Sequence, residues 1–334
     1  MELAGTFRLL VICLALVPGW ALGWDNTGHE TMAAITFAEL SPAARAAVTG
    51  LLKEHPRYEK DLLAGKPEGM DADEYAFMIA ATWPDMVRAQ NHPMHFVANH
   101  PAWHYIDIAY VQPGFTPPPA TQPAAQPAVG DAANGPRDIV EALTKMTADL
   151  TNPSVAPGDR AIALCWVLHL CGDIHQPLHA TDYFSPQFPE GDKGGNSIII
   201  LRVPNVYYTK TNLHALWDEM LGTYDSPRLI GYLAQGLRSD PDFSREKLKD
   251  ALAVRDFAAW AQESHDLAVT HCYLNGTLQG VSADAARGDA PVQVPAVPPG
   301  YIEAGEQFAA RRIITAGYRA ADLLNLIFDP EHPH

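Results

Sequence analysis

The chain has 334 residues, with 39 Asp and Glu against 23 Lys and Arg, so its formal net charge is −16 at pH 7. This acidic balance excludes a protein that grips nucleic acid through a broad basic face. It leaves open a site whose positive charge comes from bound metal ions.

The N-terminal segment 1–23 has the layout of a secretory signal peptide. It has a basic start, an apolar run (LLVICLALVPGWAL) and small residues at Ala21 and Gly23. The run is too short, and too interrupted by a proline and a glycine, to span a membrane. No later stretch is long and apolar enough for a membrane helix. We therefore expect cleavage after Gly23 and a soluble, secreted or periplasmic protein that begins at Trp24.

Most of the remaining chain shows the periodicity of amphipathic helices. Ala, Leu and Ile recur at helical spacing in the segments 28–40, 42–54, 72–90, 137–150, 158–176, 225–238, 244–271 and 301–328. Only SIIILRV (197–203) and VYYTK (206–210) resemble strands, and Pro204-Asn205 between them predicts a hairpin. We predict a mainly α fold, a single multi-helix catalytic domain over residues 24–334 with one small β-hairpin.

Two low-complexity segments, 112–136 and 282–300, are rich in Pro, Ala and Gly. Such a composition is typical of extended surface loops. These segments could link separate domains, but chemically active motifs lie on both sides of the first one. We therefore favour insertions in one domain.

Beyond the signal peptide the chain has three cysteines, Cys165, Cys171 and Cys272. The first two are six residues apart on a predicted helix, which places their Cα atoms about 9 Å apart and too far for a disulfide. One of them could pair with Cys272, and at least one thiol should stay free.

The stretch LHLCGDIHQPLH (168–179) concentrates three histidines and an aspartate. On a helix, His169 and Asp173 are four residues apart and share a face, whereas His175 points about 240° away from His169. The following proline ends the helix, so His179 must approach from the next loop. The predicted set is His169, Asp173 and His179, with His175 outside it.

Four further motifs carry candidate site residues. They are WDNTGH (24–29), WPDMVR (83–88), WHYID (103–107) and NLHALWD (212–218), and they contribute Trp24, His29, Asp85, Arg88, His104, Tyr105, Asp107, His214 and Asp218. Each motif alone also fits a structural role, such as a helix cap at Asp85 or a core histidine. In combination, imidazoles and carboxylates without thiolates suit catalytic zinc. A freed α-amine at Trp24, with a pKa near ~8, could chelate metal together with its own carbonyl oxygen.

In their order along the chain, these motifs resemble the zinc-dependent single-strand nuclease and 3′-nucleotidase family (fungal nuclease S1/P1 type), which is distantly related to bacterial zinc phospholipase C. The resemblance runs from Trp24 to the last helix and implies a phospholipase C/nuclease-like helical fold with three Zn²⁺ ions. By this resemblance, one zinc is bound by Asp85, His104, His169 and Asp173, a second by the Trp24 amine and carbonyl with His29 and the shared Asp173, and a third by His179, His214 and Asp218.

The sequence departs from the family at a few positions. Asp25 stands where the family usually has Gly, and Pro84 where it has Ala. The family's disulfides have no matching cysteine pairs, and the two Pro-rich loops are extra. Gly194-Gly195-Asn196 resembles a family stretch near the site, but we expect a tight turn before the hairpin without a site contact.

The resemblance implies hydrolysis of single-stranded DNA and RNA to 5′-phosphorylated nucleotides, and of the 3′-monoester of nucleotides. Asp85 is expected to orient or deprotonate the attacking water, and Arg88 to donate to the transition-state phosphate. Tyr105 would form a wall of a base pocket, and Asp107 would hydrogen-bond the base. A core tyrosine and a surface carboxylate are equally good interpretations of these two residues.

Two other functions stay open. A phospholipase C-type phosphodiesterase would use the same metal scaffold, but that branch has Glu at the position of Asp218. A non-catalytic exported zinc-binding protein would have no need of the shared ligand Asp173. No obligatory protein partner is evident from the sequence.

Overall fold

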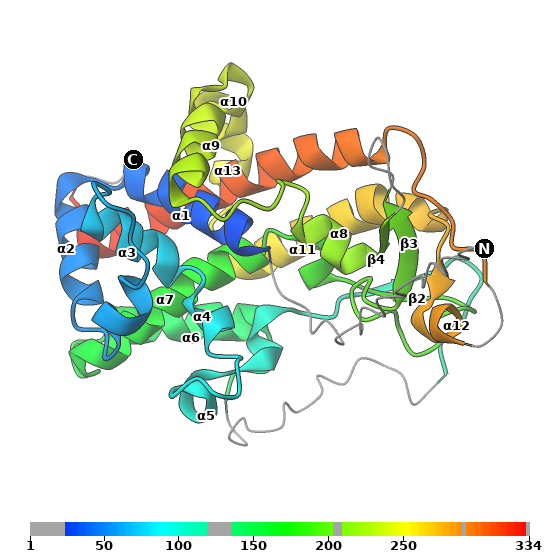
Figure 1. Cartoon of the computed structure of the whole chain (residues 1–334), viewed down its shortest axis with the longest axis horizontal. Helices are drawn as coiled ribbons and strands as arrows, with labels where there is room; N and C mark the ends of the chain where they lie inside the picture. Colours follow the sequence, from blue (N-terminus) through cyan, green and yellow to red (C-terminus); the bar gives the residue numbers. More distant parts are fainter. Residues whose placement is uncertain (1–23, 119–134, 203–208, 289–291, 332–334) are drawn as a thin grey trace, which may run out of the picture.

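The computed structural model describes residues 24–118, 135–202, 209–288 and 292–331, and three long helices form its centre (Figure 1). These are α1 (Asn26–Glu39), α7 (Pro157–Asp173) and α13 (Tyr301–Phe328). Helix α7 is buried on nearly every side from Ala161 to Asp173, as expected for a helix that is apolar all round. Helix α1 packs on both α7 and α13. The predicted mainly α fold is confirmed.

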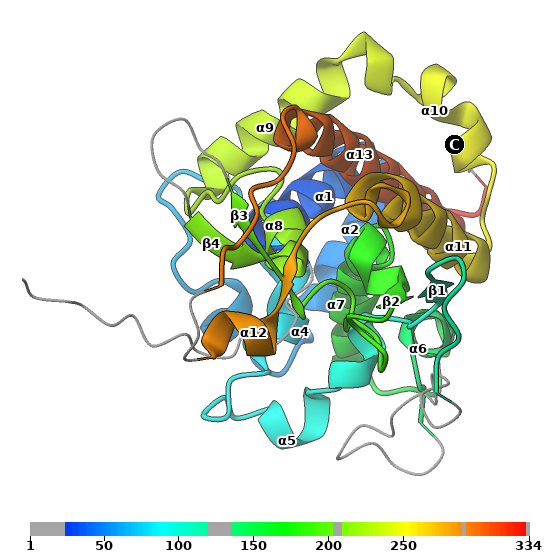
Figure 2. The same ribbon diagram turned by 90° about the vertical axis from the view of Figure 1, so that its right-hand side faces the viewer.

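Further helices surround this centre. They are α2 (Pro42–Leu52), α3 (Ala72–Ala80), α4 (Trp83–Met86), α5 (His95–Ala98), α6 (Ile139–Thr151), α8 (Leu213–Asp218), α9 (Pro227–Ser239), α10 (Arg245–Leu252), α11 (Phe257–Leu267) and α12 (Ala283–Arg287). Short 3₁₀ turns (Pro101–His104, Pro177–Ala180, Pro241–Phe243 and Leu274–Gly276) and π turns (Tyr58–Leu62 and Ala268–Cys272) complete the helical structure. Helices α9 and α10 lie outside α13, and α5 lies at the opposite edge in Figures 1 and 2.

Two helices that were predicted to be continuous are interrupted in the structure. The predicted helix 72–90 breaks after Ala80 and restarts as the short α4, because Pro84 has no amide hydrogen to continue the hydrogen-bond ladder. The predicted helix 244–271 is divided into α10 and α11, and Asp256 begins the second part by accepting a hydrogen bond from the amide of Ala259.

The predicted hairpin is confirmed as the pairing of β3 (Ile198–Arg202) with β4 (Thr209–Asn212), which are antiparallel. Its predicted turn at Pro204-Asn205 and the predicted start of the second strand at 206 lie outside the described residues. Strand β5 (Val281–Ser282) pairs with the other edge of β3. A second pairing that was not predicted joins β1 (Ala109–Val111) to β2 (Asp182–Phe184) in parallel.

The two Pro-rich segments differ from one another. Residues 112–118 form neither helix nor strand, as expected, and 119–134 lie outside the described residues. The prediction of an extended loop over 282–300 was wrong at its start, where Ser282 caps α12 by accepting a hydrogen bond from Ala285. Short capped helices of this kind are stabilised by one side chain and leave little periodicity in a sequence.

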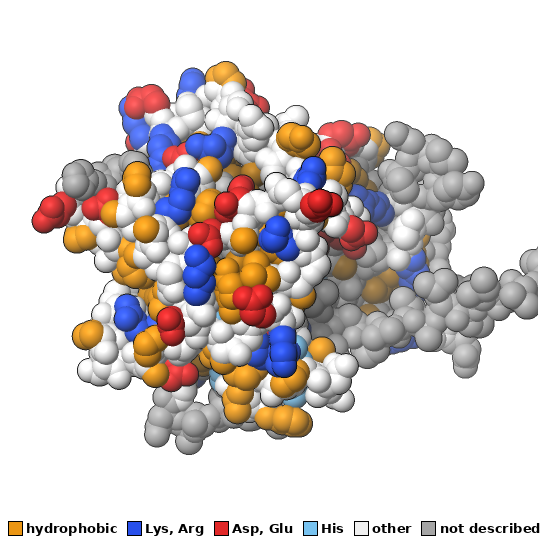
Figure 3. Space-filling view, turned by 60° about the vertical axis from the view of Figure 1, so that its left-hand side comes forward, with side chains coloured by type: hydrophobic (Ala, Val, Ile, Leu, Met, Phe, Trp, Pro, Cys, Tyr) orange, Lys and Arg blue, Asp and Glu red, His pale blue; other side chains and the backbone are white. Residues whose placement is uncertain are grey.

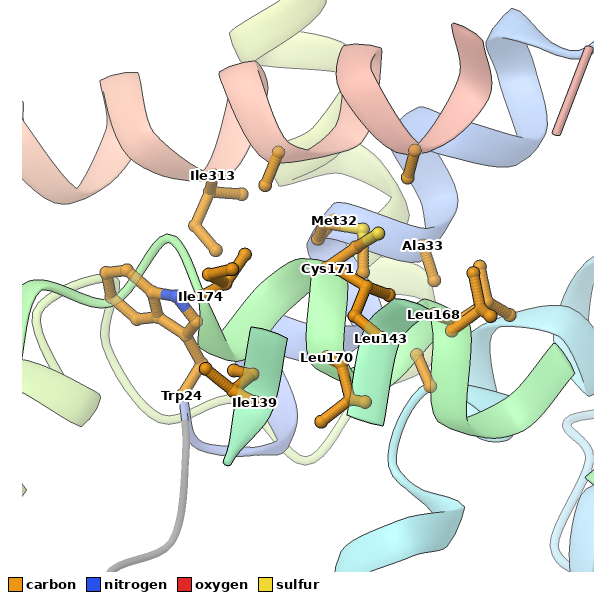
Figure 4. Packing of buried hydrophobic residues seen from close by; sticks show 14 of the residues in the cluster. Trp24, Met32, Ala33, Ile139, Leu143, Leu168, Leu170, Cys171, Ile174 and Ile313 are labelled. Atoms are coloured by element: carbon orange, nitrogen blue, oxygen red, sulfur yellow. The ribbon is translucent and has the colours of Figure 1, made fainter. Parts of the chain in front are cut away.

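The core lies between α1, α7 and α13. Figure 4 shows Trp24, Met32, Cys171, Ile174 and Ile313 converging there, and each is buried. Cys165, Cys171 and Cys272 are buried free thiols, so the pairing with Cys272 that the sequence left open does not occur. Among the described helices, none combines the length and apolar character that crossing a membrane requires. The proposed signal peptide, residues 1–23, lies outside the described residues.

Candidate metal centre

Helix α7 carries the centre of the site at its C-terminal end. His169 and Asp173 are fully buried there, and their Nε2 and Oδ2 atoms lie 3.0 Å apart, as their four-residue spacing predicted. A buried carboxylate is costly unless it is surrounded by partners. The imidazoles of His29, His104 and His179, which come from three other elements, surround the Asp173 carboxylate.

The two oxygens of Asp173 face two different groups of residues. Oδ2 lies 3.1 Å from Nδ1 of His104 and 3.0 Å from Nε2 of His169. Oδ1 lies 3.2 Å from Nε2 of His29, which comes from α1 and stacks on the His169 ring. Asp173 is therefore placed to bridge two sites.

The first group consists of Asp85, His104 and His169, whose nearest ligand atoms all lie within 4.8 Å of one another. His104 Nδ1 and His169 Nε2 are 2.9 Å apart, and Oδ1 of Asp85 is 3.9 Å and 4.0 Å from these two atoms. Asp85 reaches the group from α4, the helix that restarts at Trp83. The break in the predicted helix thus directs this carboxylate toward α7.

The second group contains His29, His169 and Asp173, and Trp24 lies beside it. The indole of Trp24 is fully buried and donates a hydrogen bond to the carbonyl of Gly172, next to Asp173. Gly28 packs so closely on Trp24 that an added Cβ would lie 2.6 Å from the Trp24 Cβ. These contacts fix residue 24 at the edge of the centre.

The third group consists of His179, His214 and Asp218. Nε2 of His214 lies 3.1 Å from Nε2 of His179 and 3.6 Å from Oδ2 of Asp218. His179 belongs to the turn after α7, as predicted, whereas the other two lie one turn apart on α8. All three side chains are buried.

Backbone carbonyls set the tautomer of three of these histidines. Nδ1 of His169 donates a hydrogen bond to the carbonyl oxygen of Ala81 (2.7 Å). In the same way, Nδ1 of His179 donates to the carbonyl oxygen of His104 (2.6 Å), and Nδ1 of His214 donates to the carbonyl oxygen of Gly194 (2.6 Å). A carbonyl only accepts, so each neutral ring carries its proton on Nδ1 and directs an Nε2 lone pair into the centre. This is the arrangement that metal-binding histidines use.

Several buried atoms at the centre have no hydrogen-bond partner among the residues that the structure describes. They are both ring nitrogens of His29, Nε2 of His104 and Oδ1 of Asp173. Burial lowers the pKa of His104 to about 4 and, with the neighbouring His169, also lowers the pKa of His29, so both rings are neutral near pH 7. Unpaired buried polar groups of this kind call for a ligand.

The carboxylates differ in their electrostatic surroundings. Burial opposes ionisation of Asp173, but His169 and His179 outweigh it and hold the pKa of this carboxyl well below its usual range. Burial raises the pKa of Asp218 well above its usual range, and the nearby carboxylates of Asp173, Asp25 and Asp85 raise it further. A bound cation would relieve this concentration of negative charge.

Arg88, Tyr105 and Asp107 are less buried than the groups above. Nη1 of Arg88 lies 3.0 Å from Oδ1 of Asp85, and 15% of its side chain is exposed. Burial raises the pKa of Tyr105, on which the charges of Asp107 and Arg88 also act, and burial raises the pKa of Asp107 to about 7 with a contribution from Asp182. These partly exposed side chains therefore lie within electrostatic reach of one another beside the first group.

The order and spacing of these groups along the chain can be compared with known families. A model of the family described as S1/P1 Nuclease matches residues 24–329. The chain belongs to the S1/P1 nuclease family. The predicted resemblance is therefore confirmed, and as a member of a nuclease family the chain is a hydrolase of phosphodiester bonds.

Individual S1/P1-type relatives are similar at low identity. The chain is 25% identical to Endonuclease 4 of Arabidopsis thaliana over 98% of this chain and 96% of the relative. It is 23% identical to Nuclease S1 of Aspergillus oryzae over 91% and 92% of the two chains. Endonuclease 5 of Arabidopsis thaliana is 30% identical over 55% of this chain and 56% of its own length.

Two supports of the S1/P1-type site were missed by the sequence analysis. Gln176 donates a hydrogen bond from Nε2 to Oδ1 of Asp218 over 2.7 Å. The expectation that Gly194-Gly195 makes no site contact was wrong, because the Gly194 carbonyl orients His214. Gly194 has φ +60°, and an added Cβ would lie 2.5 Å from the Leu178 carbonyl oxygen. In the sequence, only the pair of adjacent glycines indicated this contact.

His175 lies outside the three groups, as predicted. Its Nδ1 donates to the carbonyl of Cys171, and its Nε2 accepts a hydrogen bond from Arg319 on α13. Arg312 on the same helix donates to the His175 carbonyl oxygen. His175 therefore fastens the turn after α7 to α13 and leaves the neighbouring His179 directed at the centre.

Proposed function

We propose that the protein is an exported three-zinc nuclease that hydrolyses single-stranded DNA and RNA to 5′-phosphorylated nucleotides and also acts as a 3′-nucleotidase. The observation that carries this proposal is the convergence of three His/Asp groups around Asp173, whose two oxygens face different groups. A shared carboxylate of this kind is what a pair of adjacent metal ions requires.

The donor set fits zinc. The proposed ligands of one ion are Asp85, His104, His169 and Asp173; of the second, the Trp24 amine and carbonyl, His29 and Asp173; and of the third, His179, His214 and Asp218. Neutral imidazoles with inward lone pairs and carboxylates without thiolates are typical ligands of catalytic zinc. Oδ1 of Asp173 and Nε2 of His29, which lie 3.2 Å apart without a hydrogen bond, are the specific observation that favours a metal here.

Bound zinc would supply Lewis-acid polarisation of a phosphate and lower the pKa of a water molecule. Asp85 would orient that water, because its carboxylate is the partly exposed member of the first group. Arg88, held 3.0 Å from Asp85, would donate its planar guanidinium to the phosphate as negative charge develops. Tyr105 and Asp107 would hold the base beside the phosphate.

Export is part of the proposal because the N-terminal amine must be set free. Residues 1–23 have the layout of a signal peptide, and the family match begins at residue 24. Trp24 is already fixed by its indole and by Gly28. Cleavage after Gly23 would then place the new amine at the second proposed zinc.

The test is to incubate the purified mature protein with denatured DNA, 3′-AMP and phosphatidylcholine, each with and without a chelator. We expect chelator-sensitive release of 5′-phosphorylated nucleotides from DNA and of phosphate from 3′-AMP. Hydrolysis of the lipid alone would instead support a phospholipase. Bound zinc without turnover of any substrate would support a zinc-binding protein.

A further inference from the structure

Helix α5 presents two apolar side chains to solvent. Phe96 is 91% exposed and Val97 is 67% exposed, the first being the highest value for a large hydrophobic side chain in the described part of the chain. Met86, on the neighbouring α4, is 37% exposed. An exposed aromatic side chain next to a site suggests a role in binding.

The segment that carries Phe96 is firmly attached. The buried carboxylate of Asp61 accepts hydrogen bonds from Nε1 of Trp83 (3.0 Å) and from Nε2 of His92 (3.1 Å), and so ties the start of α4 to the residues before α5. Nδ1 of His92 accepts from the amide of Met94, which fixes the proton on Nε2. Ala98, at the end of α5, is buried. Phe96 is therefore exposed although the segment that carries it is held in place on both sides.

This segment is directly connected to the metal centre. Nδ1 of His95 donates to the carbonyl of Val87 over 2.9 Å, and Val87 lies between Met86 and Arg88. The ring of Phe96 is held edge-on against His95, with 5.1 Å between centroids. Phe96 thus lies on a helix that is hydrogen-bonded to the segment that follows Asp85.

The surrounding charge is unusual for this acidic protein. No Asp or Glu occurs between Asp85 and Asp107, whereas the segment contains Arg88 and four histidines. Figure 3 shows hydrophobic side chains beside basic and histidine side chains at the lower edge of the molecule, the level at which α5 lies in Figures 1 and 2. A segment without acidic residues of its own suits an approaching phosphate backbone better than the rest of this acidic chain.

We propose that α5 is a subsite for single-stranded substrate, in which Phe96 stacks on the base of a nucleotide flanking the scissile phosphate. This rests on the proposed nuclease function. Stacking on an aromatic ring accepts any base, and the segment between Asp85 and Asp107 adds no carboxylate of its own. A protein partner is disfavoured, because two or three side chains provide far less than the ~800 Å² per partner that a stable interface buries.

The test compares Phe96→Ala with Tyr232→Ala, a change at a 70% exposed aromatic side chain on α9, at the opposite edge of the molecule. The substrates are a short single-stranded oligonucleotide and 3′-AMP. We expect Phe96→Ala to raise the KM for the oligonucleotide about tenfold and to leave 3′-AMP unchanged, because a mononucleotide has no flanking base. Phe96→Trp should restore the KM, and Tyr232→Ala should have no effect.

Equal effects of Phe96→Ala on both substrates, or no effect on the oligonucleotide, would overturn the subsite. Binding of a phosphorothioate oligonucleotide, followed by fluorescence anisotropy, gives a readout independent of turnover. If wild-type protein bound it through Phe96 without cleaving any nucleic acid, the proposed nuclease function would fail while the subsite stood. Unchanged thermal unfolding of the variants would show that folding is intact.

Discussion

The Nε2 atoms of His179 and His214 lie 3.1 Å apart, and each ring donates a hydrogen bond from its Nδ1 to a backbone carbonyl oxygen. In the neutral form of both rings, two Nε2 lone pairs therefore face one another at hydrogen-bond distance. Such an arrangement is repulsive in a buried site unless a cation lies between the nitrogens.

Removal of metal should therefore destabilise the protein. An ion present at 100 times its Kd adds about 2.7 kcal/mol to the free energy of unfolding, which for a chain of this size corresponds to a Tm shift of about 4 °C. We expect a chelator to lower the Tm by at least this amount, and zinc to restore it, in a calorimetric scan. His179→Ala should bind one ion fewer by elemental analysis than the control His271→Ala, whose ring packs on Phe308 away from the three groups. An unchanged Tm after complete metal removal would contradict the proposed centre.

An additional residue before Trp24 should remove one zinc. The indole of Trp24 is buried against Gly172, so the position of residue 24 cannot shift to make room. We expect a mature chain with one extra N-terminal Gly to bind one ion fewer and to lose at least about tenfold in kcat. A chain with an extra residue at the C-terminus is the control. Full metal content in the extended chain would show that the N-terminus is not a ligand.

Gln176→Met should weaken the third metal site. The substitution keeps the length of the side chain but removes the hydrogen bond to Asp218 and leaves this buried carboxylate without its amide donor. Loss of such a supporting contact commonly lowers metal affinity by about 10–100-fold. The matched control is Gln262→Met, which removes an exposed amide–carboxylate hydrogen bond to Asp266 on α11. Equal zinc affinities, measured by competition with a chelating dye, would exclude a supporting role for Gln176.

Local spacing was sufficient to predict much of the centre. His169 and Asp173 share a face because four residues make about one helical turn, and His179 follows from the proline that ends α7. The same applies to His214 and Asp218 on α8. Each of these pairs is determined within one element, so the sequence pattern contains the information.

Contacts between distant elements were not predictable in this way. The carbonyl of Gly194 reaches His214 across 20 positions, and β1 pairs with β2 although each strand has three residues. Strands this short are not recognisable from an alternation of apolar and polar residues, and the position of a backbone carbonyl cannot be predicted from residue types. The break before α4 could have been inferred from Pro84, but helical periodicity on both sides concealed it.

Arg88→Lys should lower kcat about 100-fold with little change in metal content. Lysine keeps the positive charge beside Asp85 but loses the planar donor pair that would contact the transition-state phosphate. If Arg88 served only to hold Asp85, the variant would instead lose zinc or stability. Single-turnover kinetics on 3′-AMP, together with elemental analysis, separate these outcomes.

Asp107→Asn should change how stability and substrate binding depend on pH. Burial, with a contribution from Asp182, raises the pKa of Asp107 to about 7, whereas in the unfolded chain this carboxyl ionises near 3.8, the ordinary value for an aspartate. Between these values the folded state holds a proton that the unfolded state has released, so the contribution of Asp107 to stability falls as the pH rises toward 7. The Tm of the variant should therefore exceed that of the wild type by a margin that grows up to pH 7 and then levels.

The same titration should govern base recognition. If Asp107 accepts a hydrogen bond from the base, the ionised carboxylate accepts it more strongly than the protonated acid, so the wild-type KM for 3′-AMP should fall as the pH passes through 7. Asp107→Asn cannot titrate, so the ratio of the two KM values, measured from pH 5.5 to 8.5, isolates this group from the metal ligands. A ratio independent of pH would place Asp107 outside the base-binding site.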